Sequence, residues 1–354
     1  MNKNKRNALM AVLRGEKADK PPFTIYEWLV PDGHKNAPWV NSSLTLIGAC
    51  SSVGRRFAGV EVVKEEIRER GERKTLLRYV TPSGELRKKT AYDPTLGSAW
   101  IEEHPVKTTA DMELIGQIYG AIELPLNRGG MADSVRRMGD KGIVLDTLPP
   151  VPVVEMWVEL MGPVLWSEAL LTERRLFAEL HDIIKKAYLK QVELVAAGSA
   201  EVVWLPDNVT AAMVSPDTYR EFCLPVYAEA CAMLKASGKL SFAHYDGDNL
   251  PLKELIGGTG IDIIEAFTPP PMSRMSVRDA RLAWPDKVLS MNFPGNLFGE
   301  KEEVIRSHAA RYLAEGMSDP FVIGCTEEFA VKHFARAFQA IAEALESGTW
   351  RVGA

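Results

Sequence analysis

The feature that most constrains the fold is a repeated alternation of short apolar runs and longer amphipathic segments from about residue 140 onward. Glycines such as Gly198, Gly238 and Gly316 stand where the intervening helices should end. The apolar runs cover residues 142–146, 201–207, 240–246, 261–267, 288–293 and 320–325. The segments between them predict helices at residues 173–197, 215–237, 250–257, 276–284, 301–316 and 330–347. Short buried strands that alternate with helices indicate a parallel sheet.

Two earlier runs, at residues 23–28 and 59–64, bring the expected number of strands to eight. The sequence therefore predicts an α/β fold, the (β/α)8 TIM barrel, with a doubly wound open sheet as the alternative. Residues 60–106 differ, because polar and apolar residues alternate there between turn signals. This pattern predicts an antiparallel β-hairpin or meander inserted near the N-terminus. Residues 1–354 are expected to form a single domain, since we find no linker or internal repeat.

The composition excludes several classes of protein. The formal net charge is −5, from 42 Lys and Arg residues against 47 Asp and Glu residues, so the broad positive surface of a nucleic-acid-binding protein is not expected. No apolar run approaches the ~20 residues of a membrane-spanning helix. The basic N-terminal segment lacks the apolar core of a secretion signal, and the four cysteines form no CxxC pair. These features predict a cytoplasmic enzyme.

In a β/α barrel the active site lies at the carboxyl ends of the strands, where polar side chains from different strands meet. The polar residues at or just after these ends are Glu27, Asp146, Asp207, Asn208, His244, Tyr245, Asp246, Glu265, Asn292, Cys325, Glu327 and Glu328. We expect them to share one rim of the barrel. The pair Asp207-Asn208 is equally compatible with a turn that caps the following segment.

Three of these residues, His244, Asp246 and Cys325, form a candidate metal site. His244 and Asp246 are two positions apart, so they share a face of a strand. Imidazole, thiolate and carboxylate are tetrahedral ligands of zinc, and a catalytic zinc keeps one position open. Glu265 is a candidate for a further ligand or for the hydrogen-bond partner that orients His244. On spacing alone the alternative is favoured: a hydrogen-bonded histidine, structural carboxylates and a buried free cysteine.

Five segments carry a further signal. They are RNALMAVLRG from Arg6, DKPP from Asp19, SPDTYREFCLPVY from Ser215, GKLSFAHYDG from Gly238 and GCTEEF from Gly324. Together they resemble the uroporphyrinogen decarboxylase superfamily, and within it the corrinoid-dependent methyltransferases. The resemblance implies a β/α barrel, in agreement with the count of strands.

Two branches of this superfamily differ in their functional residues. The true decarboxylases carry an Arg-Gln-Ala-Gly-Arg-Tyr segment after the first strand, whose arginines bind substrate carboxylates, whereas this chain continues from Tyr26 as YEWLVPDG without an arginine. The methyltransferases bind zinc through a His-x-Cys pair and a distant Cys. His244 and Cys325 match the outer ligands, and Asp246 stands in place of the middle cysteine. An oxygen ligand leaves zinc a stronger Lewis acid, so the resemblance implies the O-demethylating members.

The residues and the resemblance together predict a zinc-dependent methyltransferase. It would take a methyl group from a small donor, an aryl methyl ether, and pass it to the Co(I) corrinoid (cobalamin) of a separate carrier protein. Asp207 and Glu327 are the candidate catalytic residues, which donate a proton or position the ring. The candidate substrate-binding residues are Tyr26, Trp28, Asn208, Tyr245 and Asn292. A homodimer is expected by analogy with the superfamily, and neither nucleic acid nor membrane is an expected partner.

Three alternatives to this function remain open. The first is the reverse transfer, from a methylcorrinoid to a thiol or folate. The second is a decarboxylase of a smaller acid, in which strand-end carboxylates act as general acids. The third is a non-catalytic barrel that binds a corrinoid or tetrapyrrole. Bound zinc, metal-free decarboxylation and ligand binding without turnover distinguish these alternatives.

Overall fold

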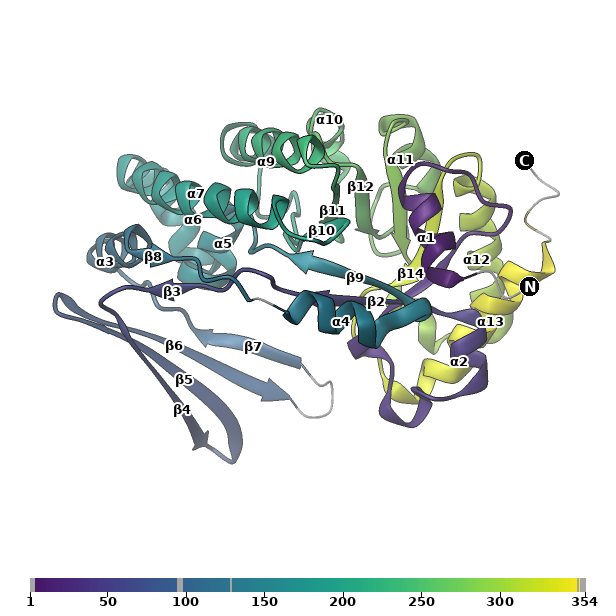
Figure 1. The fold of residues 1–354 in the computed structure, drawn as a ribbon, viewed down its shortest axis with the longest axis horizontal. Helices are drawn as coiled ribbons and strands as arrows, with labels where there is room; N and C mark the ends of the chain where they lie inside the picture. The colour runs from purple at the N-terminus through teal and green to yellow at the C-terminus, as the bar shows by residue number, and fades with distance from the viewer. Residues whose placement is uncertain (1–3, 94–97, 128, 349, 351–354) are drawn as a thin grey trace. The chain divides into compact units, whose positions relative to one another are not determined.

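The chain forms two compact units in a computed structural model that describes residues 4–93, 98–127, 129–348 and 350. The residues of unit 1 are Met1–Ser52, Arg128–Thr147 and Ala196–Ala354. The residues of unit 2 are Val53–Asn127 and Leu148–Val195. Figure 1 shows the parallel strands of unit 1 and the antiparallel strands of unit 2.

Unit 1 is built around a closed barrel of parallel strands in the order β1-β14-β13-β12-β11-β10-β9-β2, which confirms the predicted α/β TIM barrel. The strands are β1 (Phe23–Tyr26), β2 (Thr45–Cys50), β9 (Gly142–Thr147), β10 (Val202–Leu205), β11 (Leu240–His244), β12 (Ile263–Phe267), β13 (Val288–Asn292) and β14 (Phe321–Cys325). Every neighbouring pair runs parallel, so all eight strands direct their carboxyl ends to the same rim.

The predicted position of the second barrel strand, at residues 59–64, is wrong. That place is taken by residues 45–50, and residues 61–69 form β4 (Glu61–Glu69) of an antiparallel sheet in unit 2. The physical reason is that the two segments differ in their content of charged residues. The segment TLIGAC of β2 has no charged residue, as expected of a strand covered on both faces, whereas β4 mixes apolar residues with many charged ones.

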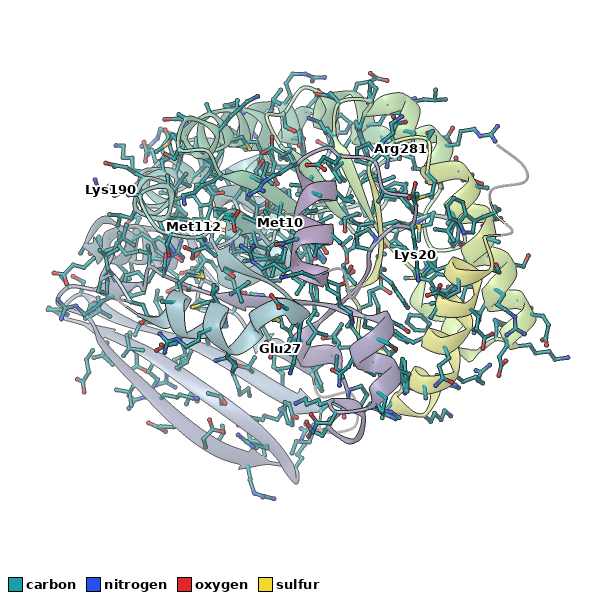
Figure 2. All side chains as sticks on the ribbon, turned by 45° about the vertical axis from the view of Figure 1, so that its right-hand side comes forward. Met10, Lys20, Glu27, Met112, Lys190 and Arg281 are labelled. Atoms are coloured by element: carbon teal, nitrogen blue, oxygen red, sulfur yellow. The ribbon has the colours of Figure 1, made fainter. Side chains whose placement is uncertain are left out.

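The barrel interior is filled by apolar side chains. The cluster contains Tyr26, Ile47, Ile143, Leu145, Val202, Phe242, Ile263, Val288 and Val322. The helix α1 (Lys5–Leu13) adds Leu9, Met10, Val12 and Leu13. Several cluster members are the first residues of their strands, so α1, on which Figure 2 marks Met10, covers the end where the strands begin. Each such burial stabilises the fold by about 1.5–3 kcal/mol and leaves the other end of the barrel for polar groups.

The remaining helices of unit 1 follow the strands and lie around them (Figure 1). They are α2 (Pro38–Ser43), α4 (Gly130–Met138), α8 (Pro216–Thr218), α9 (Leu224–Ala236), α10 (Lys253–Gly257), α11 (Val277–Ala283), α12 (Glu302–Gly316) and α13 (Phe334–Ser347), with a π-helical turn η5 (Tyr219–Cys223). Ser215 is the N-cap at the start of the helix predicted for residues 215–237, because its hydroxyl accepts from the Thr218 N–H at 3.2 Å.

Unit 2 contains the antiparallel meander predicted for residues 60–106. Its sheet has the order β4-β5-β6-β7, with β5 (Glu72–Thr81), β6 (Gly84–Asp93) and β7 (Ser98–Glu103) beside β4. The other elements are β3 (Arg56–Phe57), α3 (Thr109–Gly120), β8 (Ile122–Glu123), α5 (Pro152–Glu155), α6 (Gly162–Thr172), α7 (Arg174–Ala196) and a π-helical turn η4 (Met156–Met161). Among the residues that the structure describes, no helix has both the length and the apolar character needed to cross a membrane.

Candidate functional site

Three hydrogen-bonded side chains lie at the carboxyl ends of the barrel strands. Tyr26 ends β1, His244 ends β11, and Glu265 lies in β12 in register with His244. Nδ1 of His244 donates to Oε2 of Glu265 at 2.8 Å, and the Tyr26 hydroxyl donates to Oε1 of that carboxylate at 2.7 Å. Glu265 thus has the geometry of the partner that orients His244, one of the two roles expected for it from the sequence.

The carboxylates around His244 favour its protonated form in the metal-free chain. Nε2 of His244 lies 3.8 Å from Oδ2 of Asp246. Burial lowers the pKa of His244, but Glu265 and Asp246 outweigh burial and raise the pKa to about 10. Burial and Glu265 also raise the pKa of Tyr26, so the phenol keeps its proton and remains a donor. Because Nδ1 is engaged, Nε2 is the nitrogen available to a metal ion.

A strained residue, Ala266, directly follows Glu265. Its φ is 58°, and the register between β12 and β13 shifts between Glu265 and Phe267, as in a β-bulge. A bulge re-aims the neighbouring side chains and is common next to active sites. A left-handed alanine costs about 1–2 kcal/mol. The fold therefore holds an unfavourable backbone conformation beside the carboxylate that orients His244.

We expect Ala266→Gly to raise the free energy of unfolding by up to about 1 kcal/mol. Glycine adopts a positive φ freely, which removes the strain from the folded state, and the larger backbone entropy of glycine in the unfolded chain offsets only part of this gain. Urea unfolding followed by tryptophan fluorescence measures the change. The matched control is Ala243→Gly in the regular strand β11, which should destabilise the protein. A clear loss of stability in Ala266→Gly would show that the left-handed alanine is not strained.

An aromatic surface lies beside His244. The rings of Tyr26 and Trp28 stack with centroids 4.5 Å apart and an interplanar angle of 22°. Trp204 of β10 lies 5.5 Å from Tyr26 and 6.2 Å from His244. Trp28 is 51% exposed. We name Tyr26, Trp28 and Trp204 the aromatic shelf, which offers an apolar face to a planar ligand.

Sequence reasoning missed Trp204. This residue comes two positions after Val202, whose side chain belongs to the barrel interior, so strand alternation directs Trp204 inward as well. The signal was present in the sequence as an aromatic residue close to a strand end and in phase with the interior positions. Its indole Nε1 is buried and has no hydrogen-bond partner among the described residues.

Glu327 and Asn292 form a second polar group at this rim. Asn292, which ends β13, is fully buried, and both ends of its amide are bonded within the protein, one of them to the Thr326 N–H at 3.0 Å. Burial and Asp246 raise the pKa of Glu327, against hydrogen bonds from Asn292 and the Gly295 backbone. A carboxyl group of this kind keeps its proton to a higher pH, as a general acid requires.

Cys325 is buried, and its side chain leaves β14 on the face opposite to the barrel interior. Val322 fills the barrel interior, so alternation along β14 directs Gly324 inward and Cys325 outward. Its Sγ lies 3.6 Å from the carbonyl oxygen of Glu327. Burial raises the pKa of the Cys325 thiol well above its ordinary range, so the metal-free chain holds a thiol rather than a thiolate.

The candidate ligands fit zinc in kind, although they are not gathered around one point. Within the part of the chain that the structure describes, no three His, Cys, Asp or Glu side chains form a ready metal site. The available donors are Nε2 of His244, a carboxylate of Asp246 at 3.8 Å and the thiol of Cys325. Closure around zinc would therefore require Cys325 to turn toward His244 and to lose its proton.

Asp207 and Tyr245, also predicted at the site, lie in a buried cluster of phenols. The Tyr227 hydroxyl donates to Oδ2 of Asp207 at 2.7 Å, and the hydroxyls of Tyr219 and Tyr245 are 2.8 Å apart. Asp207 and Tyr245 are fully buried, and their partners come from α9 and η5. Asn208 is exposed with φ 47°, as the turn alternative expects. Their predicted roles in binding or catalysis remain predictions.

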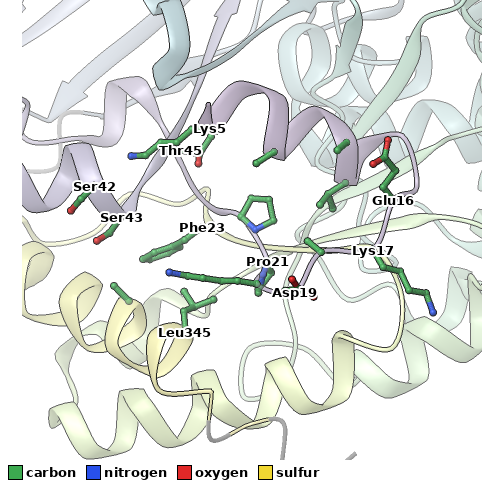
Figure 3. A pocket seen from close by; sticks show the side chains of 17 residues that line it. Lys5, Glu16, Lys17, Asp19, Pro21, Phe23, Ser42, Ser43, Thr45 and Leu345 are labelled. Carbon is green, nitrogen blue, oxygen red and sulfur yellow. The ribbon is translucent and has the colours of Figure 1, made fainter. Parts of the chain in front are cut away.

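A hollow of about 480 Å³ lies at the opposite end of the barrel, where the strands begin (Figure 3). Phe23 and Thr45, the first residues of β1 and β2, line it together with α1 and α13. Two of its charged groups have structural partners: Lys5 donates to the Leu44 carbonyl after α2 at 2.6 Å, and Lys20 forms a surface ion pair. We therefore place the candidate site at the other end.

The fold and the strand-end group define a β/α-barrel protein with its polar site at the carboxyl ends of the strands. A family model described as uroporphyrinogen decarboxylase (URO-D) matches residues 157–347, more than half of the chain. The chain belongs to the uroporphyrinogen decarboxylase family. The comparison with curated protein sequences gives no match.

Solved structures resemble the chain more distantly. A B12-independent methionine synthase from Shewanella sp. W3-18-1, in complex with selenomethionine, is 13% identical over 85% of this chain and 79% of that chain, with a TM-score of 0.41. A GH5-4 broad-specificity endoglucanase from an uncultured bacterium is 8% identical over 68% and 85%, with a TM-score of 0.40. An L-Ala-D/L-Glu epimerase is 12% identical over 84% and 91%, with a TM-score of 0.23. Similarity at this level carries no functional information.

Proposed function

We propose that the protein is a zinc-dependent methyltransferase that moves a methyl group from an aryl methyl ether to the Co(I) corrinoid (cobalamin) of a separate carrier protein. The observation that carries this proposal is the aromatic shelf beside His244, whose Nδ1 is fixed by Glu265. The shelf suits a planar ring, and the polar group next to it suits the oxygen that bears the methyl group. Membership of the family supports methyl transfer or decarboxylation as the general class of reaction.

Different residues would hold the zinc ion and orient its histidine ligand. His244, Asp246 and Cys325 would hold zinc, which supplies a Lewis acid toward the leaving oxygen. Glu265 fixes the direction of the imidazole through Nδ1, and the Tyr26 hydroxyl fixes Glu265 in turn. Both of these hydrogen bonds are buried, so Nε2 of His244 keeps one direction during the reaction.

Glu327 is the residue that we expect to supply the proton. When the bond between the methyl carbon and the ether oxygen breaks, the electron pair stays on oxygen and the methyl group passes to cobalt. The raised pKa of Glu327 lets its carboxyl group protonate that oxygen. Trp28, half exposed on the shelf, would hold the ring and exclude water from one of its faces.

A decarboxylase of a small acid is the second candidate, because the raised pKa of Glu327 also suits protonation of a carbanion. The charges of the site oppose it. In the described part of the chain, no Lys or Arg forms an ion pair with Asp246, Glu265 or Glu327. A substrate carboxylate would meet several carboxylates, and the positive charge of the His244 imidazolium is already engaged by Glu265 and Asp246, which disfavours binding of that substrate.

The test combines metal analysis with a transfer assay. Zinc-loaded protein, a methoxylated phenol and a reduced corrinoid carrier are mixed, and the absorbance of Co(I) and methyl-Co(III) is followed. The proposal predicts formation of methyl-Co(III) and of the demethylated phenol, in equal amounts, only with zinc-loaded protein. Bound zinc without any spectral change over a series of methoxylated aromatics would contradict it, and release of carbon dioxide from an added acid would favour the second candidate.

Zinc affinity is expected to rise with pH. Because the pKa of His244 is about 10, the imidazole holds a proton at pH 7 that zinc must displace, and the Cys325 thiol must lose its proton as well. Each displaced proton makes the apparent affinity rise about tenfold per pH unit below the pKa of its group. Calorimetric titration in buffers of different ionisation enthalpy measures the number released. Affinity that is constant between pH 7 and pH 9 would show that these groups are not the ligands.

A further inference from the structure

A second cavity lies within unit 2 and is separate from the groups that the proposed function uses. Its volume is about 310 Å³, at the lower end of the range for small-molecule sites. All of its lining residues belong to β3, β5, β6, α3 and the segment that includes α5 and η4, or to the loops next to them. The π-helical turn η4 contributes part of the wall, and such turns are rare and often found at functional sites.

Three aromatic rings form the apolar walls of this cavity. Phe57 lies at the centre, with its ring 6.3 Å from Tyr79 in an edge-on arrangement and 5.5 Å from Tyr119. Pro149 and Pro150 add apolar surface without side-chain donors. This set of walls suits a flat ring better than a flexible polar chain.

Two ion pairs at the cavity differ in how tightly they are held. Arg55 donates to Glu155 at 2.5 Å and to Gln191 at 3.0 Å, and the Glu155 side chain is only 4% exposed, so this pair is fixed. Lys88 also pairs with a carboxylate, that of Glu159, but the Glu159 side chain is 39% exposed. The Glu159 carboxylate can therefore be solvated when it leaves Lys88, whose side chain is 17% exposed and stays at the cavity for another anion.

A free donor lies close to Lys88. The Tyr79 hydroxyl makes no hydrogen bond in the described structure, and burial together with Glu159 and Glu155 raises the pKa of this phenol, so it keeps its proton. Tyr79 in β5 and Lys88 in β6 lie on the same face of the sheet, since Tyr79 pairs with Leu86 and Leu86 is two positions from Lys88. One cation with an exchangeable partner and one neutral donor therefore line the same apolar cavity.

We propose that this cavity is a binding site for a small aromatic carboxylate. The ring would lie against Phe57, Tyr79 and Tyr119, and the carboxylate would replace Glu159 on Lys88 and accept from the Tyr79 hydroxyl. Glu159 would move into solvent, and the Arg55–Glu155 pair would stay as it is. This inference does not depend on zinc, on the corrinoid or on the proposed transfer reaction.

Benzoate is the probe that tests this site, with binding to the whole protein measured by calorimetry and by ligand-observed NMR. We expect a dissociation constant of about 1 mM or below, as for a well-placed fragment of this size. Lys88→Met should weaken binding at least about tenfold through the loss of a charge-assisted bond. Glu159→Gln should strengthen binding by about two- to fivefold, because it removes the competing carboxylate.

The controls separate this site from the barrel site. Lys89 follows Lys88 on β6 and faces the other side of the sheet, so Lys89→Met should leave benzoate binding unchanged. His244→Ala should also leave it unchanged, whatever that variant does to methyl transfer. Absence of benzoate binding, or binding that Lys88→Met and Glu159→Gln leave unaltered, would overturn the inference, and loss of binding in His244→Ala would assign benzoate to the barrel instead.

Discussion

Replacing His244 with alanine is expected to abolish stoichiometric zinc binding and to slow methyl transfer by at least about a thousandfold, the equivalent of about 4 kcal/mol of transition-state stabilisation. The reason is that Nε2 of His244 lies 3.8 Å from Oδ2 of Asp246, and the direction of the imidazole is set by its buried hydrogen bond to Glu265. Metal content after dialysis and the rate of methyl-Co(III) formation measure the two effects.

Two further variants test whether the effect of His244→Ala is specific to the metal site. Glu265→Gln keeps the shape of the side chain but removes the charge that orients the imidazole, so zinc affinity should fall by about 10- to 100-fold. His308→Ala is the matched control, since His308 lies on α12 and contacts Tyr312 there, and it should keep both zinc and activity. Full zinc binding in His244→Ala would refute the metal site.

The variant Gly142→Ala is expected to lower the free energy of unfolding by at least about 3 kcal/mol. Gly142 begins β9 and pairs with Leu46 of β2. A Cβ atom at this position would lie 1.7 Å from the Leu46 carbonyl oxygen, so the backbone of one strand has to move. β2 and β9 are also held by their other neighbours in the closed barrel, β1 and β10, so neither strand can move away without disturbing the hydrogen bonds of the barrel. Urea unfolding measures the loss.

The control for this variant is Gly33→Ala. No atom lies within 4 Å of a Cβ built at Gly33, so that substitution should change the stability by less than about 0.5 kcal/mol. If Gly142→Ala were as stable as Gly33→Ala, β2 and β9 could not pack as closely as the structure has them. The parallel register of residues 45–50 with β9, which the sequence did not predict, would then be wrong.

Most of the fold could be predicted from the sequence because its strongest signals are local. Apolar runs bounded by glycines marked the strands from residue 142 onward, and Ser215 marked the start of a helix. The second barrel strand was misplaced because β4 contains valine and isoleucine, which favour strands in parallel and antiparallel sheets alike. The absence of charge from residues 45–50 was the better signal, since strands covered on both faces read as continuous apolar runs.

The candidate site could be predicted only in part. Position at a strand end was enough to select His244, Asp246 and Glu265, which the structure brings together. Position at a strand end did not show that Cys325 faces outward, because that direction depends on its phase relative to the interior residue Val322 of β14. The bulge at Ala266 could not be predicted, because it changes the phase of β12 and leaves no mark in the composition.

X-ray absorption at the zinc K-edge of the zinc-loaded protein tests the central claim most directly. The proposed site predicts one sulfur at about 2.3 Å, nitrogen or oxygen ligands at about 2.0–2.1 Å and the multiple scattering of an imidazole ring. The sulfur contribution should disappear in Cys325→Ser, and the imidazole contribution should disappear in His244→Ala. A spectrum of the unaltered protein that contains only oxygen ligands would contradict a zinc centre built from these two residues.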